Sequence, residues 1–266
     1  MPDVLLVRAL GGDDRDAEVL RSRGVRVVED PYLVVTTCTD DEALTRAQTT
    51  LGEISERSDW LAVTSRAALR ALSDLVGKDA LAAAVAAGTR RGLACAAVGP
   101  STAHELRELG AADVLVPATP TAAGLLALLS ERSPGRLVTP QGSQAMTSWT
   151  RGLRTAGWQV DEKVVYVTAT VPHRPPTADA VARGDFAAVL FRSPTAVRAA
   201  MSFVDAIPEP TIAVCGGPTT ADEATRSGLT RVAISPGPTA ESVAESVVLA
   251  LSRLPGEPGT RAVRGD

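Results

Sequence analysis

Five short turns combine glycine, serine and threonine in a pattern that could bind an anion. Each turn follows a short apolar run and precedes a segment with helical spacing; the turns are Thr64-Ser65-Arg66, Gly99-Pro100-Ser101-Thr102, Pro140-Gln141-Gly142-Ser143, Arg192-Ser193-Pro194-Thr195 and Gly217-Pro218-Thr219-Thr220. Glycine allows backbone N–H groups to approach a ligand closely. The N–H groups in the first turn of a helix attract an anion without a basic side chain. The simpler alternative is that each hydroxyl only caps its helix, with Pro194 at the first helical position.

Other kinds of chemistry find little support in the sequence. No GxxxxGK[ST] segment is present and no GxGxxG follows the first apolar run, so nucleotide binding is disfavoured. No serine lies in a GxSxG turn, and acidic residues are scarce in the five turns. The only histidines are His104 and His173, which excludes a histidine-rich metal site, and His104 falls in a helical pattern where we expect it to face solvent.

Only two tyrosines are available as phenolic proton donors. Tyr166 lies in the extended run DEKVVYVTA, where the simplest interpretation is a half-buried strand residue. If this run passes the mouth of a ligand cleft, Tyr166 is the best candidate for a proton donor. Tyr32 occupies what we take to be the comparable place in the run VRVVEDPYLVVTT, so a duplication alone does not single out Tyr166.

Short apolar runs alternate with amphipathic segments along the chain. The expected strands are 4–8, 60–64, 93–98, 114–117, 136–140, 187–191, 211–215 and 231–235. The expected helices are 13–23, 66–75, 102–109, 122–131, 144–156, 195–204, 219–227 and 240–251. Nearly continuous Val, Leu and Ala in the strands indicates a sheet covered on both faces, so we predict an α/β fold with flavodoxin-like parallel sheets.

An internal duplication organises the chain. GPSTAHELRELG at 99–110 recurs as GPTTADEATRSG at 217–228, DWLAVTSRAALRAL at 59–72 resembles DFAAVLFRSPTAVRAAM at 185–201, and a weaker pair begins at Arg8 and Gln141. The order of the copies is permuted, and the long β-rich runs after Gly24 and Gly157 have no helix pattern directly behind them. We therefore predict two lobes joined by a two-stranded β connector, residues 1–34 with 170–254 and residues 35–169, followed by a disordered tail at 255–266.

Composition narrows the functional classes further. The chain has 266 residues, with 27 basic and 31 acidic side chains and a net charge of −4, so nucleic acid is an unexpected partner. Cys38, Cys95 and Cys215 are odd in number and show no CxxC pairing, and we expect each to be reduced, cytosolic and buried as a small hydrophobe. The first apolar stretch is broken by Arg8 and is too short for a signal or membrane segment, so we expect a cytoplasmic protein with no membrane contact.

The chain resembles the uroporphyrinogen-III synthase family over about residues 4–252. The resemblance rests on the first strand ending in Arg8 and on the segments DWLAVTS, AVGPSTAHELRELGA, VPATPTAAGLL, PQGS, VVYVT, FRSPTAV and GGPTTADEA. FRS in place of the commoner FTS puts Arg192 in the turn, and CGGPTT replaces an apolar residue before a single glycine. The family architecture, two α/β lobes joined by a pair of strands, agrees with the permuted repeat.

The resemblance implies a reaction and a set of site residues. It implies dehydration and cyclisation of hydroxymethylbilane to uroporphyrinogen III through a spiro intermediate, by a monomer that uses no metal or cofactor and allows transient contact with hydroxymethylbilane synthase. Tyr166 falls on the implicated tyrosine. The substrate-binding residues are expected to be Arg8, Thr64, Ser65, Ser101, Thr102, Gly142, Arg192, Ser193, Thr219 and Thr220. Two non-enzymatic alternatives remain: a two-lobed ligand-binding protein and a regulator that retains the synthase fold.

Overall fold

The chain folds into two compact α/β units. The structure is a computed structural model, and it describes residues 3–10, 15–145 and 147–253. One unit comprises residues 1–34 and 170–266, and the other comprises residues 35–169. The tail expected to be disordered, 255–266, and the expected helix start at Asp13 lie outside the described residues.

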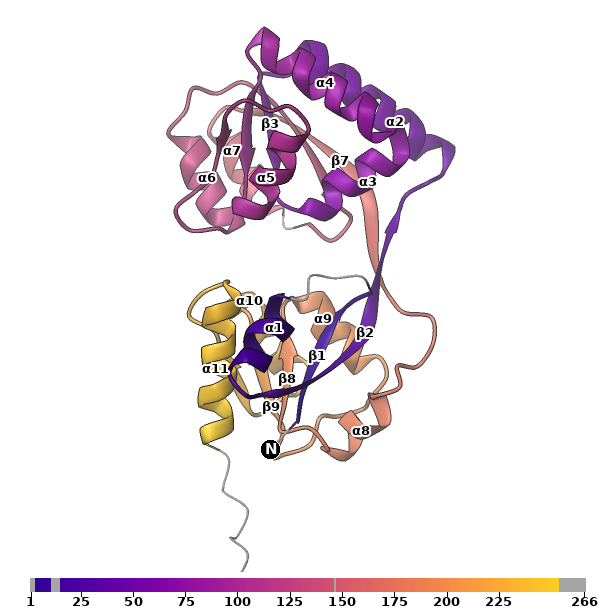
Figure 1. Ribbon diagram of the computed structural model, residues 1–266, viewed down its shortest axis with the longest axis vertical. Coiled ribbons are helices and arrows are strands. Elements are labelled where there is room, and N and C mark those ends of the chain that lie inside the picture. The colour runs from indigo at the N-terminus through magenta and orange to yellow at the C-terminus, as the bar shows by residue number, and fades with distance from the viewer. Residues whose placement is uncertain (1–2, 11–14, 146, 254–266) are drawn as a thin grey trace, which may run out of the picture. The chain divides into compact units, whose positions relative to one another are not determined.

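The first unit is a parallel sheet covered by helices on both faces (Figure 1). Its strand order is β10-β9-β8-β1-β2, and each neighbouring pair is parallel. One face packs against α1 and α11, and the other packs against α8, α9 and α10. The elements are β1 (Asp3–Ala9), α1 (Arg15–Ser22), β2 (Arg26–Thr37), α8 (Ala178–Arg183), β8 (Ala188–Phe191), α9 (Pro194–Met201), β9 (Ile212–Cys215), α10 (Pro218–Arg226), β10 (Val232–Ile234) and α11 (Ala240–Ser252).

The second unit has the same layered design, with strand order β7-β6-β3-β4-β5 and parallel pairs throughout. Helices α2 to α5 cover one face, and α6 and α7 cover the other. The elements are α2 (Asp41–Gly52), the π-helix η1 (Glu53–Arg57), β3 (Trp60–Val63), α3 (Arg66–Val76), α4 (Lys78–Arg91), β4 (Ala94–Ala97), α5 (Pro100–Glu108), β5 (Val114–Leu115), α6 (Ala122–Ser130), β6 (Arg136–Gly142), α7 (Ser148–Thr155) and β7 (Gln159–Thr170).

The two sheets have the same strand arrangement with different connectivity. In the first unit the strands lie in the order 2-1-3-4-5 along the chain, which is the flavodoxin-like order. In the second unit β6 and β7 take the first two places, although they come last in that unit's sequence. Strands β2 and β7 are neighbours in the strand order, and each runs from one unit into the other. The α/β fold with parallel sheets that the sequence predicted is confirmed.

Several sequence predictions about elements were wrong. The run after Gly24 was expected to have no helix directly behind it, yet α2 begins at Asp41, close after the end of β2 at Thr37. Asp40 caps α2 by accepting a hydrogen bond from the Ala43 N–H at 2.8 Å, and this acidic cap was not recognised. The alanine-rich α4 was also missed. The helix expected from Gln144 begins only at Ser148.

The three cysteines differ in their surroundings. Cys95 and Cys215 are buried, and desolvation by burial raises the pKa of Cys95 to about 11 and that of Cys215 to about 12. Cys38 is only partly buried, which corrects the expectation that all three are core residues. It lies in the segment between β2 and α2, where its N–H donates to the Val165 carbonyl at 3.0 Å.

We expect a thiol reagent to distinguish these cysteines. At pH 8 the folded protein should react at one thiol per chain, at Cys38, because burial keeps Cys95 and Cys215 protonated and covered. After unfolding in denaturant, all three cysteines in the sequence should react. Titration with a chromogenic disulfide checks this, and rapid reaction of two or more thiols in the folded protein would contradict it.

Candidate active site

In the second unit, two helices begin at candidate turns but in different ways. Helix α3 is capped by Ser65, whose hydroxyl accepts a hydrogen bond from the Ala67 N–H at 3.1 Å, while Thr64 precedes it half-buried. The N-cap of α5 is Gly99, so no side chain caps this helix. Ser101 and Thr102 therefore lie inside the first turn of α5, where Ser101 is exposed and Thr102 is buried.

The first unit repeats this contrast. Ser193 caps α9 by accepting a hydrogen bond from the Ala196 N–H at 3.2 Å. The N-cap of α10 is Gly217, so this helix has no side-chain cap. Its first turn contains Thr219, which is exposed, and Thr220, which is buried.

Helix capping therefore explains only some of the hydroxyl groups in these four turns. It holds for the hydroxyls of Ser65 and Ser193, which are already used within the protein. It fails at the starts of α5 and α10, where a glycine precedes a proline. These two helices present first-turn N–H groups that no side chain caps, which is the arrangement that an anion such as a carboxylate can bind.

The fifth turn differs from the other four. Residues Pro140, Gln141 and Gly142 lie within strand β6, and α7 starts only at Ser148, so this turn is not the start of a helix as predicted. Gln141 is buried, and its Nε2 donates to Glu162 Oε2 at 2.7 Å. The turn therefore contributes the end of a strand to the candidate site.

Tyr166 lies directly beside Gly142. The two residues are register partners in the β6–β7 pair, and the Ser143 N–H donates to the Tyr166 carbonyl at 2.9 Å. A Cβ at position 142 would lie 2.5 Å from two ring carbons of Tyr166 and 2.8 Å from its hydroxyl oxygen. The missing side chain of Gly142 is what allows the half-buried ring to rest on the end of β6.

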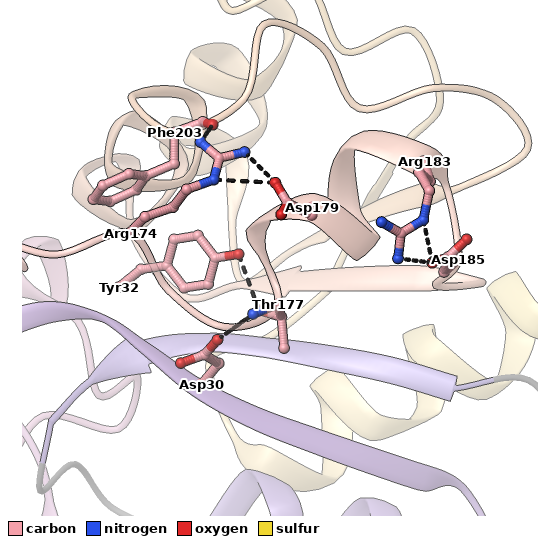
Figure 2. Close-up of polar contacts among 8 residues, drawn as sticks. All are labelled: Asp30, Tyr32, Arg174, Thr177, Asp179, Arg183, Asp185 and Phe203. Carbon is pink, nitrogen blue, oxygen red and sulfur yellow. Dashed lines mark hydrogen bonds and ion pairs between the residues drawn. The ribbon is translucent and has the colours of Figure 1, made fainter.

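Tyr32 has a different environment and a different role. It is fully buried, its hydroxyl lies 3.0 Å from Thr177 Oγ1, and its ring packs edge-on against Phe203. Figure 2 shows the phenol directed at Thr177, which in turn donates to Asp30. Burial, the largest cause, raises the pKa of Tyr32. A phenol enclosed in this way supports the fold and is not available to a substrate.

The strand register also corrects the sequence comparison of the two tyrosines. Leu33 pairs with Ala9 after a register shift in β1–β2, just as Tyr166 pairs with Gly142 after a shift in β6–β7. The counterpart of Tyr166 is therefore Leu33, not Tyr32. Tyr166 therefore has no tyrosine at the equivalent position of the first unit.

The two candidate arginines are both engaged inside the first unit. The Arg8 guanidinium, at the end of β1, forms an ion pair with Glu29. Arg192 donates to the Pro238 carbonyl at 2.6 Å, and its Nε lies 3.3 Å from Asp16 Oδ2. Both side chains remain partly exposed, at 24% and 38%. Each can reach a ligand only by sharing or exchanging a protein partner.

Sequence reasoning overlooked the carboxylates that contact these strand ends. Glu29 and Glu162 were not considered, although an alignment of the repeats starting from Arg8 and Gln141 places them at equivalent positions. Within the described residues, no cluster of three or more His, Cys, Asp or Glu could hold a metal ion. No helix in the described part of the chain is long and apolar enough to span a membrane.

In a parallel α/β fold, helix N-termini that follow the carboxyl ends of strands and have no side-chain cap are typical places for an anionic ligand to bind. The sequence matches the family described as uroporphyrinogen-III synthase HemD over residues 14–245, and the chain belongs to this family. It is accordingly an enzyme of tetrapyrrole biosynthesis. No curated protein sequence matches the chain.

Solved structures show the same fold. A mutant uroporphyrinogen III synthase from the extremely thermophilic bacterium Thermus thermophilus has 16% sequence identity and a TM-score of 0.59, with 95% of this chain and 99% of that chain covered. Uroporphyrinogen-III synthetase from Helicobacter pylori has 15% identity and a TM-score of 0.60, with 95% and 99% covered.

Proposed function

We propose that this enzyme converts hydroxymethylbilane to uroporphyrinogen III, with inversion of the last pyrrole ring through a spiro intermediate. The substrate is a flexible chain of four pyrroles that carries many carboxylates. Each unit by itself offers donors that suit such anionic arms: the first-turn N–H groups of α5 in the second unit, and the first-turn N–H groups of α10 with Arg8 and Arg192 in the first. The site therefore works mainly by orienting the substrate, and this lowers the barrier by removing the entropy cost of ring closure.

Tyr166 acts as the proton donor in this proposal. Its phenol protonates the terminal hydroxyl of the substrate, which leaves as water, and the electron-rich pyrrole stabilises the resulting cation. The substituted carbon of the last ring then attacks to form the spiro intermediate, and after rearrangement the macrocycle loses one proton. This proton restores the Tyr166 phenol, so the net change is loss of one water. The observation that carries the proposal is the placement of the Tyr166 ring on Gly142 at the carboxyl end of β6.

The decisive experiment is an isomer assay. Freshly generated hydroxymethylbilane is supplied, the products are oxidised, and isomers I and III are separated. The enzyme should yield isomer III, whereas the spontaneous reaction, followed with heat-denatured protein, should yield isomer I. An isomer ratio equal to that of the denatured control would overturn the proposal and favour a non-enzymatic ligand-binding or regulatory role.

Replacing Tyr166 by Phe should lower kcat by roughly 100-fold, because the leaving hydroxyl loses its proton donor. The phenylalanine ring should keep the place of the tyrosine ring over Gly142, so the midpoint of thermal unfolding should change little. Slow turnover lets spontaneous closure compete, so the fraction of isomer I should rise. Tyr32→Phe provides the matched control, since Tyr32 is enclosed in the first unit and should affect stability only. Full turnover by Tyr166→Phe would remove the proton-donor role.

A further inference from the structure

A polar pocket of about 410 Å³ lies in the second unit, at the starting ends of two strands. It is lined by residues of the π-helix η1 and of the first positions of β6 and β7: Glu53, Arg57, Arg136, Gln159, Val160 and Asp161. Pockets of this size are typical of sites that hold a small organic molecule. The pocket is separate from Gly142 and Tyr166, because Arg136 begins β6 and Gly142 ends it, roughly 20 Å away at about 3.3 Å per residue.

Strand alternation brings the polar side chains of this pocket to one face of the sheet. Leu137 packs under α6 and α7, and Glu162 forms an ion pair with Arg154 on α7. Their strand neighbours Arg136 and Asp161 therefore project to the other face, which α2 to α5 cover. The π-helix η1 packs on this same face and supplies two of the lining residues. Helical turns of this wide type are uncommon and are found frequently at functional sites.

The two carboxylates of the pocket wall already have a cationic partner. Lys163, whose side chain is only 10% exposed, donates to Glu53 Oε1 at 2.9 Å and lies 3.0 Å from Asp161 Oδ1. Burial lowers the pKa of Lys163, but its contacts with these carboxylates outweigh that effect and raise the pKa overall, so the ammonium group stays charged. The second oxygen of Glu53, Oε2, is buried. Lys163 therefore offsets part of the negative charge in the pocket wall.

The two arginines of the pocket, by contrast, are exposed and unpaired. Within the described residues, neither the Arg57 nor the Arg136 guanidinium takes part in a hydrogen bond or an ion pair. Asp59 accepts a hydrogen bond from the backbone N–H of Arg136, at 2.9 Å, and not from its side chain. A guanidinium group offers five N–H donors in a planar fork that matches the oxygens of a carboxylate or phosphate. The pocket therefore combines unused donors with carboxylates that are held by Lys163.

We propose that this pocket binds a small organic anion through a phosphate or carboxylate group. Arg57 on η1 and Arg136 on β6 hold the charged oxygens by charge-assisted hydrogen bonds. A phosphate or carboxylate group alone fills only part of the pocket, so the ligand extends past its anionic group toward Gln159. Because the site lies at the starting ends of the strands, it does not overlap with the candidate active site.

Nuclear magnetic resonance of the arginine Nε–H groups tests this site directly. The signals of Arg57 and Arg136 are assigned by their loss in Arg57→Gln and Arg136→Gln, and the protein is titrated with inorganic phosphate and with succinate at constant ionic strength. Both signals should shift and saturate together, with a Kd of about 1 mM or lower for the preferred anion. Stronger binding of phosphate would identify a phosphorylated ligand, and stronger binding of succinate a carboxylate ligand.

A variant shows whether the two arginines hold one anion. Arg136→Gln should weaken binding measured at the Arg57 signal roughly 10-fold, because one charge-assisted contact is lost. Arg151→Gln is the matched control, since Arg151 is also exposed but lies on α7 over the opposite face of the sheet, and it should leave this Kd within about twofold. Saturation of neither signal below about 10 mM anion, or an Arg57 Kd that Arg136→Gln leaves unchanged, would overturn the inference. No substrate is used, so the outcome is independent of the proposed function.

Discussion

Gly142→Ala is expected to lower kcat about 100-fold. The added Cβ would lie 2.5 Å from the Tyr166 ring, so the ring must move, and a displacement of about 1 Å at a reacting group can cost two orders of magnitude in rate. The obstructing atoms belong to the end of a side chain and not to the backbone, so the ring can turn away while the strand stays paired. Steady-state kinetics and isomer analysis should give a profile close to that of Tyr166→Phe.

Two comparisons make this prediction specific. Gly52→Ala is the control, because Gly52 lies at the end of α2 with nothing within 4 Å of its added Cβ, and its kinetics should be normal. The double variant Gly142→Ala with Tyr166→Leu copies the Ala9–Leu33 pair of the first unit, so it should fold well and remain inactive. If Gly142→Ala keeps full turnover, catalysis does not require the Tyr166 ring to stay over Gly142.

The start of each helix could have been predicted more closely from the sequence than it was. Proline favours the first helical position, so the residue before it is the N-cap. This rule assigns the cap to Ser193 in one turn but to Gly99 and Gly217 in two others, as the structure has it. The sequence pattern alone therefore separates the hydroxyl that caps a helix from the hydroxyls that lie inside the first turn.

By contrast, the sequence could not show that the counterpart of Tyr166 in the first unit is Leu33 and not Tyr32. A register shift in each of β1–β2 and β6–β7 inserts one extra residue, Tyr32 in one strand and Val165 in the other. As a result Tyr32 and Leu33 pack against one core, and Val165 and Tyr166 pack against the corresponding core in the other unit. Strand alternation in the sequence gives no sign of such a bulge, because bulges depend on the neighbouring strand.

Asp30→Ala is expected to give the largest loss of stability among the polar substitutions considered, about 3 kcal/mol. The buried Asp30 carboxylate accepts hydrogen bonds from the Thr177 N–H at 2.8 Å and from the Thr177 hydroxyl at 2.7 Å, and that hydroxyl contacts the buried phenol of Tyr32 (Figure 2). Removing the carboxylate leaves both donors without an acceptor where water cannot easily replace it. Chemical denaturation measures the free energy of unfolding.

Asp185→Ala is the matched control, because the Arg183–Asp185 pair is largely exposed and should contribute less than about 1 kcal/mol. Equal effects of the two substitutions would show that the link between β2 and the start of α8 does not stabilise the first unit.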